Sequence, residues 1–143
     1  MEQLSERKLT RAEFNFVERK LYDYPANKQI IADYEAQREA ILHRTKDNDG
    51  QPRGSGIGKP TETTAIQLAL LEQRVKCEAF WIRAIEDTLE LLSDEDKTLV
   101  QLKYFEGYLT NEGIMLRMGM SKKRFYRMRD EIITKFARRM MLI

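Results

Sequence analysis

The chain has 143 residues, of which 42% are hydrophobic and 34% charged, and its net charge is +2. This length predicts one domain, or one small domain with an accessory helical part, and no apolar run approaches the length of a membrane span. The N-terminal stretch MEQLSERKLTRAEF lacks the apolar segment of a secretory signal, and the single cysteine, Cys77, excludes an internal disulfide. One cysteine and one histidine cannot build a typical zinc site, so we expect a cytoplasmic protein without a metal or other cofactor.

The charge is distributed unevenly along the chain. Residues 115–143 contain nine Lys or Arg and two Asp or Glu, a net charge of +7. The remaining 114 residues contain 16 basic and 21 acidic residues, a net charge of −5. Basic charge gathered at one end of a chain is typical of a protein that binds a polyanion there.

Residues 1–45 are predicted to form an N-terminal helical segment. Thr10 and Glu13 have the spacing of a capping box, which opens a helix. The apolar stripe of this helix consists of Phe14, Val17, Leu21 and Tyr24. Pro25 is predicted to end or kink the helix, because proline lacks a backbone N–H. A second helix is predicted over residues 27–43, with an apolar stripe made of Ile30, Ile31, Tyr34, Ile41 and Leu42.

Residues 46–61 are rich in glycine and proline and are predicted to be a linker. The pair Gly58-Lys59 suggests a phosphate-binding loop, but the spacing of that motif is not met. Arg53 stands where the first glycine belongs, and Pro60 stands where a hydroxyl must hold Mg²⁺. The segment is therefore interpreted as a tether.

Residues 62–92 are predicted to form one long helix. Seven of its eight heptad positions are apolar, and Glu78 is the exception. The heptad positions are Leu68, Leu71, Val75, Glu78, Ile82, Ile85, Leu89 and Leu92. Phe80 and Trp81 widen this apolar face. The face either packs on the N-terminal helices of the same chain or forms the seam of a homodimer, and both arrangements are compatible with the pattern.

Residues 93–143 are predicted to form a DNA-binding domain with a helix-turn-helix. Ser93 caps a helix that ends at Gly107, with a core face made of Leu99, Leu102, Tyr104 and Phe105. Thr110 caps a short helix that ends at Gly119, and Ser121 caps a longer basic helix. The inward stripe of that last helix consists of Phe125, Met128, Ile132 and Phe136.

This stripe determines which side chains of the last helix face outward at its N-terminal end. They are Ser121, Lys122, Lys123, Arg124, Tyr126 and Arg127. Arginine can donate two hydrogen bonds to guanine, lysine bonds guanine or phosphate, and the start of a helix binds phosphate oxygens. We therefore predict that these six residues contact double-stranded DNA. Basic residues near a helix C-terminus also occur for reasons of solubility alone, so the prediction depends on the turn and on the preceding helix.

The segment LVQLKYFEGYLTNEGIMLRMGMSKKRFYRMRDEII resembles the helix-turn-helix of sigma-factor region 4. Over nearly its whole length the chain resembles the RinA-type phage transcriptional activators and the related ArpU family. The matching segments are LTRAEFNFVERKLYDYPANKQIIADYEAQREAIL, GSGIGKPTETTA and SKKRFYRMRDEIITKFA. The resemblance implies an all-α protein, in which a helical bundle precedes a sigma region 4-like helix-turn-helix. It also implies a phage or prophage regulator that activates late genes by binding promoter DNA and acting on host RNA polymerase in the bacterial cytoplasm. One departure is Met115, because such units usually have a small residue where the two helices cross; Gly113 is expected to leave room for it.

Two other classes of function are compatible or incompatible with the sequence to different degrees. A phage DNA-packaging recognition subunit, similar to a small terminase, uses the same motif and forms large rings. An enzyme is not expected, because His43 and Cys77 have no catalytic partner nearby and no nucleophile elbow is present. The acidic residues Glu86, Asp87, Glu90 and 94–96 form either a polymerase contact or a solvated surface.

Overall fold

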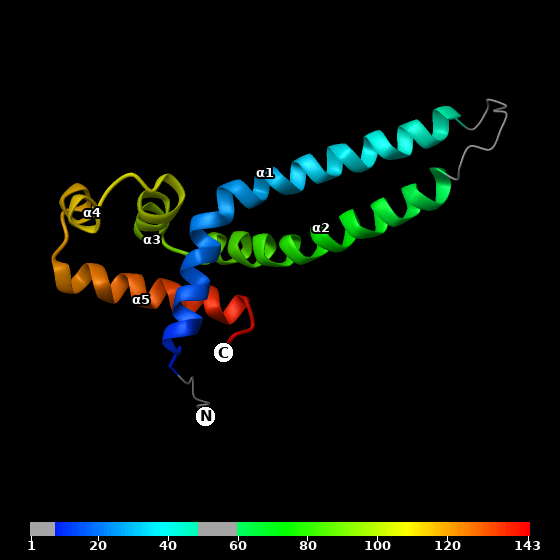
Figure 1. The fold of residues 1–143 in the computed structure, drawn as a ribbon. Helices are drawn as coiled ribbons and strands as arrows, with labels where there is room; N and C mark the ends of the chain where they lie inside the picture. Colours follow the sequence, from blue (N-terminus) through cyan, green and yellow to red (C-terminus); the bar gives the residue numbers. More distant parts are fainter. Residues whose placement is uncertain (1–7, 49–59) are drawn as a thin grey trace. The chain divides into compact units, whose positions relative to one another are not determined.

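The computed structural model describes residues 8–48 and 60–143, and the regular structure within these ranges is all helical (Figure 1). The prediction of an all-α fold is therefore confirmed. The elements are α1 (Arg11–Asn48), α2 (Pro60–Leu91), α3 (Asp94–Val100), the π-helical η1 (Gln101–Glu106), α4 (Asn111–Met118) and α5 (Lys122–Arg139). Most of the predicted linker, residues 49–59, lies outside the described residues.

The chain divides into two compact units, and the boundary falls within both long helices. The first, which we call the core unit, contains residues 8–25 and Trp81–Ile143. The second, which we call the two-helix unit, is Ala26–Phe80 and contains the facing parts of α1 and α2. The core unit thus joins the start of α1 and the end of α2 to the helices from α3 onward.

α1 begins with the predicted capping box. The Thr10 backbone N–H donates to Glu13 Oε1 at 2.9 Å, and the Glu13 N–H donates to Thr10 Oγ1 at 3.1 Å. The sequence predicts that Pro25 either ends or kinks this helix. The first alternative is wrong, because α1 continues through Pro25 to Asn48. Proline removes one backbone donor, and the fully buried side chains of Val17 and Leu21 anchor the helix in the core unit just before it. The helix predicted over residues 27–43 is thus part of α1.

The region from α3 to η1 follows the predicted capping. Ser93 Oγ accepts the N–H of Asp96 at 3.1 Å, and Gly107 ends η1 with a left-handed φ of 70°. The last turns are wider than an α-helix, because the Gly107 N–H donates to the carbonyl of Leu102 five residues earlier, at 3.3 Å. Leu99 and Leu102 are buried as predicted. This ending leads the chain directly into the loop before α4.

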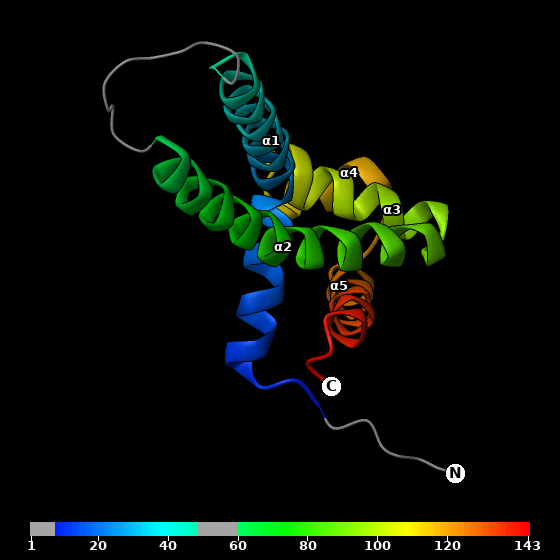
Figure 2. The same cartoon turned by 90° about the vertical axis from the view of Figure 1, so that its right-hand side faces the viewer.

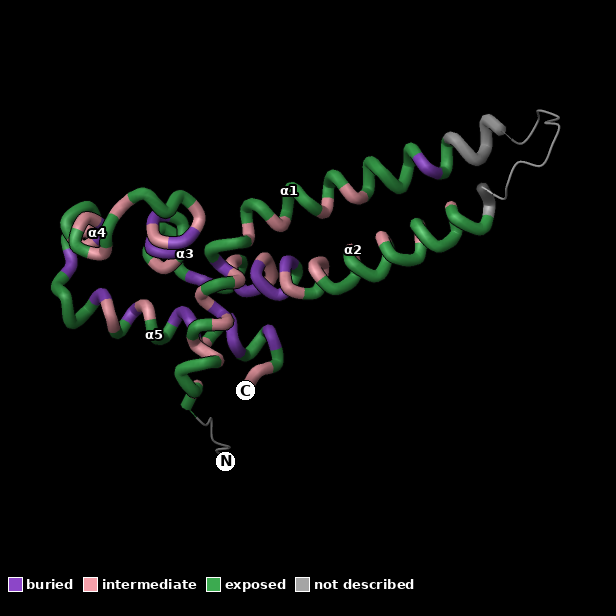
Figure 3. Tube along the Cα trace, in the orientation of Figure 1, coloured by how far each residue is buried: buried purple, intermediate pink, exposed green. Residues whose placement is uncertain are grey.

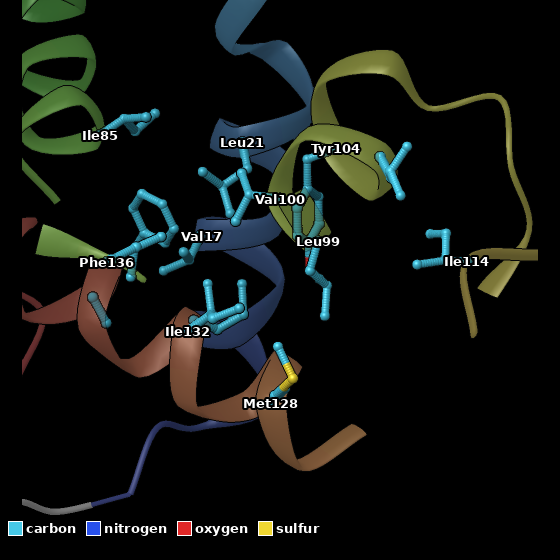
Figure 4. Packing of buried hydrophobic residues seen from close by; sticks show 14 of the residues in the cluster. Val17, Leu21, Ile85, Leu99, Val100, Tyr104, Ile114, Met128, Ile132 and Phe136 are labelled. Carbon is cyan, nitrogen blue, oxygen red and sulfur yellow. The ribbon is translucent and has the colours of Figure 1, made fainter. Parts of the chain in front are cut away.

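One hydrophobic cluster holds the core unit together, and each of its helices contributes to it (Figure 4). The central side chains are Val17 and Leu21 from α1, Ile85 from α2, Leu99 and Val100 from α3, Tyr104 from η1, Ile114 from α4, and Met128, Ile132 and Phe136 from α5. The predicted inward stripe of α5 is confirmed, since Phe125, Met128, Ile132 and Phe136 are all buried. Figure 3 shows buried and exposed residues alternating along α5. The stripe therefore fixes which side of α5 faces solvent.

The two-helix unit has little core of its own. Figures 1 and 2 show its parts of α1 and α2 side by side, yet Ile41 is the one buried residue among its described side chains (26–43 and 62–80). The predicted stripe of residues 27–43 is only partly right, because Ile30 and Leu42 are exposed by 39% and 44%. Two helices alone cannot enclose a stripe as wide as the one predicted.

The heptad face of residues 62–92 lies toward its own chain. Its first members, Leu68, Leu71, Val75 and Glu78, are half-buried in the two-helix unit. Ile82, Ile85 and Leu92 are buried in the core unit, where Ile85 and Leu92 belong to the same cluster as Val17. Of the two alternatives for this face, the structure therefore has the first: the face packs against helices of its own chain. Phe80 does not widen a buried face, because it is 45% exposed.

Candidate nucleic-acid interface

A three-residue turn joins α4 to α5, and local hydrogen bonds define each of its ends. Gly119 ends α4 with a φ of 66°, and the N–H of Met120 donates to the carbonyl of Met115 at 3.0 Å. Such a left-handed residue after a helix is the position at which glycine is preferred. Ser121 then starts α5, where its Oγ accepts the N–H of Arg124 at 3.2 Å. Because Met120 between them is 92% buried in the core (8% exposed), the direction of α5 is anchored as soon as the helix begins.

Thr110 and Gly113 determine how α4 begins. Thr110 Oγ1 accepts the N–H of Gly113 at 3.0 Å, as the capping prediction required. A Cβ placed on Gly113 would lie nearest to Thr110 Oγ1, at 3.4 Å, and to Leu109 Cδ2, at 3.5 Å. The space that Gly113 leaves therefore borders the start of its own helix, whereas the expectation was that it makes room for Met115. Met115 is half-buried and packs against the hydrophobic cluster.

A chain of polar contacts connects η1, α4 and α5. Lys103 Nζ donates to Asn111 Oδ1 at 3.1 Å, and Asn111 Nδ2 donates to the hydroxyl of Tyr126 at 3.4 Å. The Tyr126 ring packs edge-on against Phe125, with 5.1 Å between ring centroids. Tyr126, predicted to face DNA, is thus half-buried and is held between α4 and the core. Its hydroxyl lies beside Asn111, from which it accepts this partly buried hydrogen bond.

Three of the predicted contact residues are exposed cations with no ion-pair partner among the described residues. They are Lys122, Lys123 and Arg127, which lie in the first two turns of α5. Ser121 is also exposed, although its hydroxyl serves as the helix cap. No acidic side chain among the described residues pairs with these three cations, so their positive charge is not neutralised and attracts an anionic ligand.

Arg124 differs from these three cations because it is paired. Its Nη2 donates to both carboxylate oxygens of Glu95 in α3, at 2.8 and 3.0 Å. Both side chains stay partly open to solvent, with 44% and 42% of the Arg124 and Glu95 side chains exposed. Such a pair is worth at most about 1 kcal/mol in water. Nη1 and Nε make no hydrogen bond to described residues, so the guanidinium retains donors for a ligand.

The later basic residues of α5 are engaged with the protein itself. Arg129 stacks over the Phe14 ring, 4.8 Å from its centroid, and pairs with the neighbouring Asp130 at 2.7 Å. Lys135 and Arg139 lie within 3.8 and 3.9 Å of acids, Asp96 and Asp87 respectively. The acids Asp130 and Glu131 follow the first two turns directly. The exposed cations of α5 that make no ion pair with described residues, Lys122, Lys123 and Arg127, therefore lie at its N-terminal end.

The sequence prediction missed two contributions to this region. Arg117, in the last turn of α4, is exposed and has no ion-pair partner among the described residues. Arg117 belongs to the basic segment of residues 115–143, and the charge of that segment was the available signal.

Tyr104 is buried, and its hydroxyl donates to Glu18 of α1 at 2.6 Å. Burial, together with this hydrogen bond, raises the pKa of Tyr104 far above its usual value of 10.0. Nothing local to Tyr104 in the sequence indicates a partner 86 residues away.

The described residues contain neither a metal-binding cluster nor a membrane-spanning helix. Within residues 8–48 and 60–143, no group of three or more His, Cys, Asp or Glu side chains is arranged to hold a metal ion. No helix in the described part of the chain is long and apolar enough to cross a membrane. Comparisons of the chain with protein-family models, curated proteins and solved structures gave no match.

Proposed function

We propose that this protein is a phage or prophage transcriptional regulator that binds promoter DNA through α4, the turn at residues 119–121 and α5. In this proposal the two helices act as a helix-turn-helix, with α5 as the recognition helix in the major groove. The observation that carries it is the position of Lys122, Lys123 and Arg127 as free cations in the first two turns of α5. Recognition helices contact base edges with the residues at their N-terminal end.

The chemistry of each residue assigns it a role in the proposed complex. Arg127 has a free planar guanidinium that can bond O6 and N7 of a guanine, so we assign base recognition to it. Lys122 and Lys123 neutralise phosphates, and the helix start capped by Ser121 favours a phosphate oxygen. Asp130 and Glu131 repel phosphates, which limits the contact to the first two turns.

Arg124 and Tyr126 take more constrained roles. Arg124 bonds DNA with the donors that Glu95 leaves free, in an orientation that Glu95 sets. Tyr126 offers only its hydroxyl, at the edge of the interface beside Asn111.

Host RNA polymerase is the second partner in this proposal, and activation of late genes is the outcome. The resemblance to the RinA-type and ArpU activators supports both. Of the acidic residues considered for the polymerase contact, Glu95, Asp96 and Asp87 lie beside α5 cations. Glu90 and Asp94 are exposed and make no ion pair with described residues, so we assign the contact to them.

Selection of duplexes from a randomised DNA pool tests the proposal directly. The full-length protein is expected to enrich one sequence motif, and Arg127→Ala is expected to relax the preference at one base position, with a loss of about 1–3 kcal/mol for the selected duplex. Arg83→Ala is the matched control, because Arg83 is an exposed arginine of the core unit outside α5. If the wild-type protein enriches no motif, or if Arg83→Ala and Arg127→Ala behave alike, the proposed function is wrong.

A further inference from the structure

Five of the ten large hydrophobic side chains that are exposed among the described residues lie in the two-helix unit. On α2 they include Ile66, Leu70 and Phe80, exposed by 58%, 62% and 45%. Cys77 is exposed on the same helix. With Ile41 as its one buried residue among the described side chains, this unit has an apolar surface without a matching core. Such surfaces mark interaction sites in soluble proteins.

Five of the exposed residues of α2 lie in one straight stripe, which we call the outer stripe: Ile66, Leu70, Gln73, Cys77 and Phe80. They recur at intervals of four and three residues, so at 100° per residue they fall within an arc of about 80°. The half-buried residues Leu68, Leu71 and Val75 lie on the opposite side of the same helix, about 170° away. α2 thus has two apolar faces: the half-buried face packs toward α1, and the outer stripe is exposed, with Leu70, Gln73 and Cys77 at the border of the groove between the two helices.

The outer stripe borders a groove between α1 and α2 within the same unit. Leu70 and Cys77 line it from α2, and Ile30 and Tyr34 line it from α1. A helix seated on the stripe therefore gains apolar contacts on α1 as well. An exposed stripe beside a two-helix groove is suited to another helix.

We propose that the outer stripe is a homodimer interface, on which α2 of a second copy of this chain packs as a parallel coiled coil. Alternating spacings of four and three residues are those of a two-stranded seam. The stripe contains no charged residue, so two copies meet without like-charge repulsion. The Gln73 carboxamide both donates and accepts hydrogen bonds, so it pairs with Gln73 of the second copy. This inference does not rest on DNA binding.

The polar residue in the stripe selects the parallel orientation. In a parallel pair each residue faces its own counterpart, which places Gln73 opposite Gln73 and Cys77 opposite Cys77. An antiparallel pair that keeps the regular alternation of the seam shifts the two stripes, so Gln73 faces Leu70 or Cys77 and its buried amide has no amide partner. A single polar residue in a seam is a known determinant of register and oligomer state. The predicted seam through Leu68 and Ile82 is therefore replaced by a different face of the same helix.

The mass of the full-length protein in solution tests the interface. The wild-type chain is expected to sediment at twice its mass of 16.9 kDa, and Leu70→Glu is expected to be monomeric. Leu116→Glu is the matched control, because Leu116 is an 84% exposed leucine on α4, and it should remain dimeric. A monomeric wild type, or a Leu70→Glu variant that stays dimeric, would overturn the proposal. A ring of eight or more copies would also overturn it and would favour the packaging alternative.

Oxidation of the wild-type protein tests the orientation by a second measurement. Cys77 is the sole cysteine of the chain, so any disulfide joins two copies. Mild oxidation at low protein concentration is expected to convert most of the protein to a covalent dimer, and Cys77→Ser is expected to abolish it. If the dimer persists but does not cross-link, the parallel arrangement is wrong.

Discussion

The turn between α4 and α5 depends on Gly119, and Gly119→Ala isolates that dependence. Gly119 has a φ of 66°, and a Cβ placed on it would meet no atom within 4 Å. The substitution therefore causes no clash with neighbouring groups, and its whole effect comes from forcing a left-handed conformation on an L-residue. That conformation costs about 1–2 kcal/mol, which is the loss of unfolding free energy that we expect.

Gly113→Ala provides the matched control six positions earlier. Gly113 lies inside α4 without a positive φ, and its added Cβ would be 3.4 Å from the nearest side-chain atom, an ordinary contact. Alanine is favoured over glycine within a helix by about 1 kcal/mol, so this variant should be as stable as the wild type or more stable.

Urea unfolding, followed by the fluorescence of the sole tryptophan, Trp81, measures both variants. Trp81 belongs to the core unit and packs edge-on against Phe16, with ring centroids 5.2 Å apart, so its emission reports on that unit. Gly119→Asn adds a graded case, because asparagine tolerates the left-handed region and should lose less stability than alanine. Equal stability of Gly119→Ala and the wild type would refute the reasoning, since the turn would then not need this conformation in solution.

Two further predictions concern polar contacts of the core unit. Glu95→Gln is expected to change the free energy of binding to the selected duplex by up to about 1 kcal/mol in the wild type. In an Arg124→Ala background the same substitution should have no effect, because Glu95 acts through Arg124. Binding measurements on this double-mutant cycle test the coupling, and additive effects of the two substitutions would exclude it. Tyr104→Phe is expected to lower the free energy of unfolding by about 1–3 kcal/mol, because a partly buried hydrogen bond to the Glu18 carboxylate is lost. The raised pKa of Tyr104 also predicts that the wild type loses stability as the pH rises above 10.0, where the unfolded chain releases this proton first. Urea unfolding between pH 9 and 11 should show a shallower decline for Tyr104→Phe, and identical slopes for the two proteins would contradict the assignment.

Local chemistry predicted the boundaries of the short helices. Ser93, Thr110 and Ser121 each cap the helix that was expected, and Gly107 and Gly119 each end one in a left-handed conformation. Caps and glycine stops involve residues within five positions of each other, so the information lies in the sequence itself. The inward stripe of α5 could be predicted for the same reason, because it depends only on the spacing of apolar residues along one helix.

Contacts between distant segments could not be predicted in this way. The continuation of α1 through Pro25 depends on packing around Val17 and Leu21, which outweighs the local preference of proline. Arg124 pairs with Glu95, 29 residues earlier, and no pattern in one helix reports on such a partner. The periodicity of α2 showed an apolar face, but only the burial of each position distinguishes the covered face from the open one.

DNA binding by the N-terminal end of α5 is tested by the salt dependence of binding by the wild type and by Lys122→Ala/Lys123→Ala, measured by fluorescence anisotropy with the selected duplex. Each lysine that neutralises a phosphate contributes about 0.9 to the slope of log K against log salt concentration. We expect the double variant to have a slope shallower by about 2, and Lys97→Ala, an exposed lysine on α3, to keep the wild-type slope. A wild type that does not bind, or equal slopes for all three proteins, would contradict the claim that the N-terminal end of α5 binds DNA.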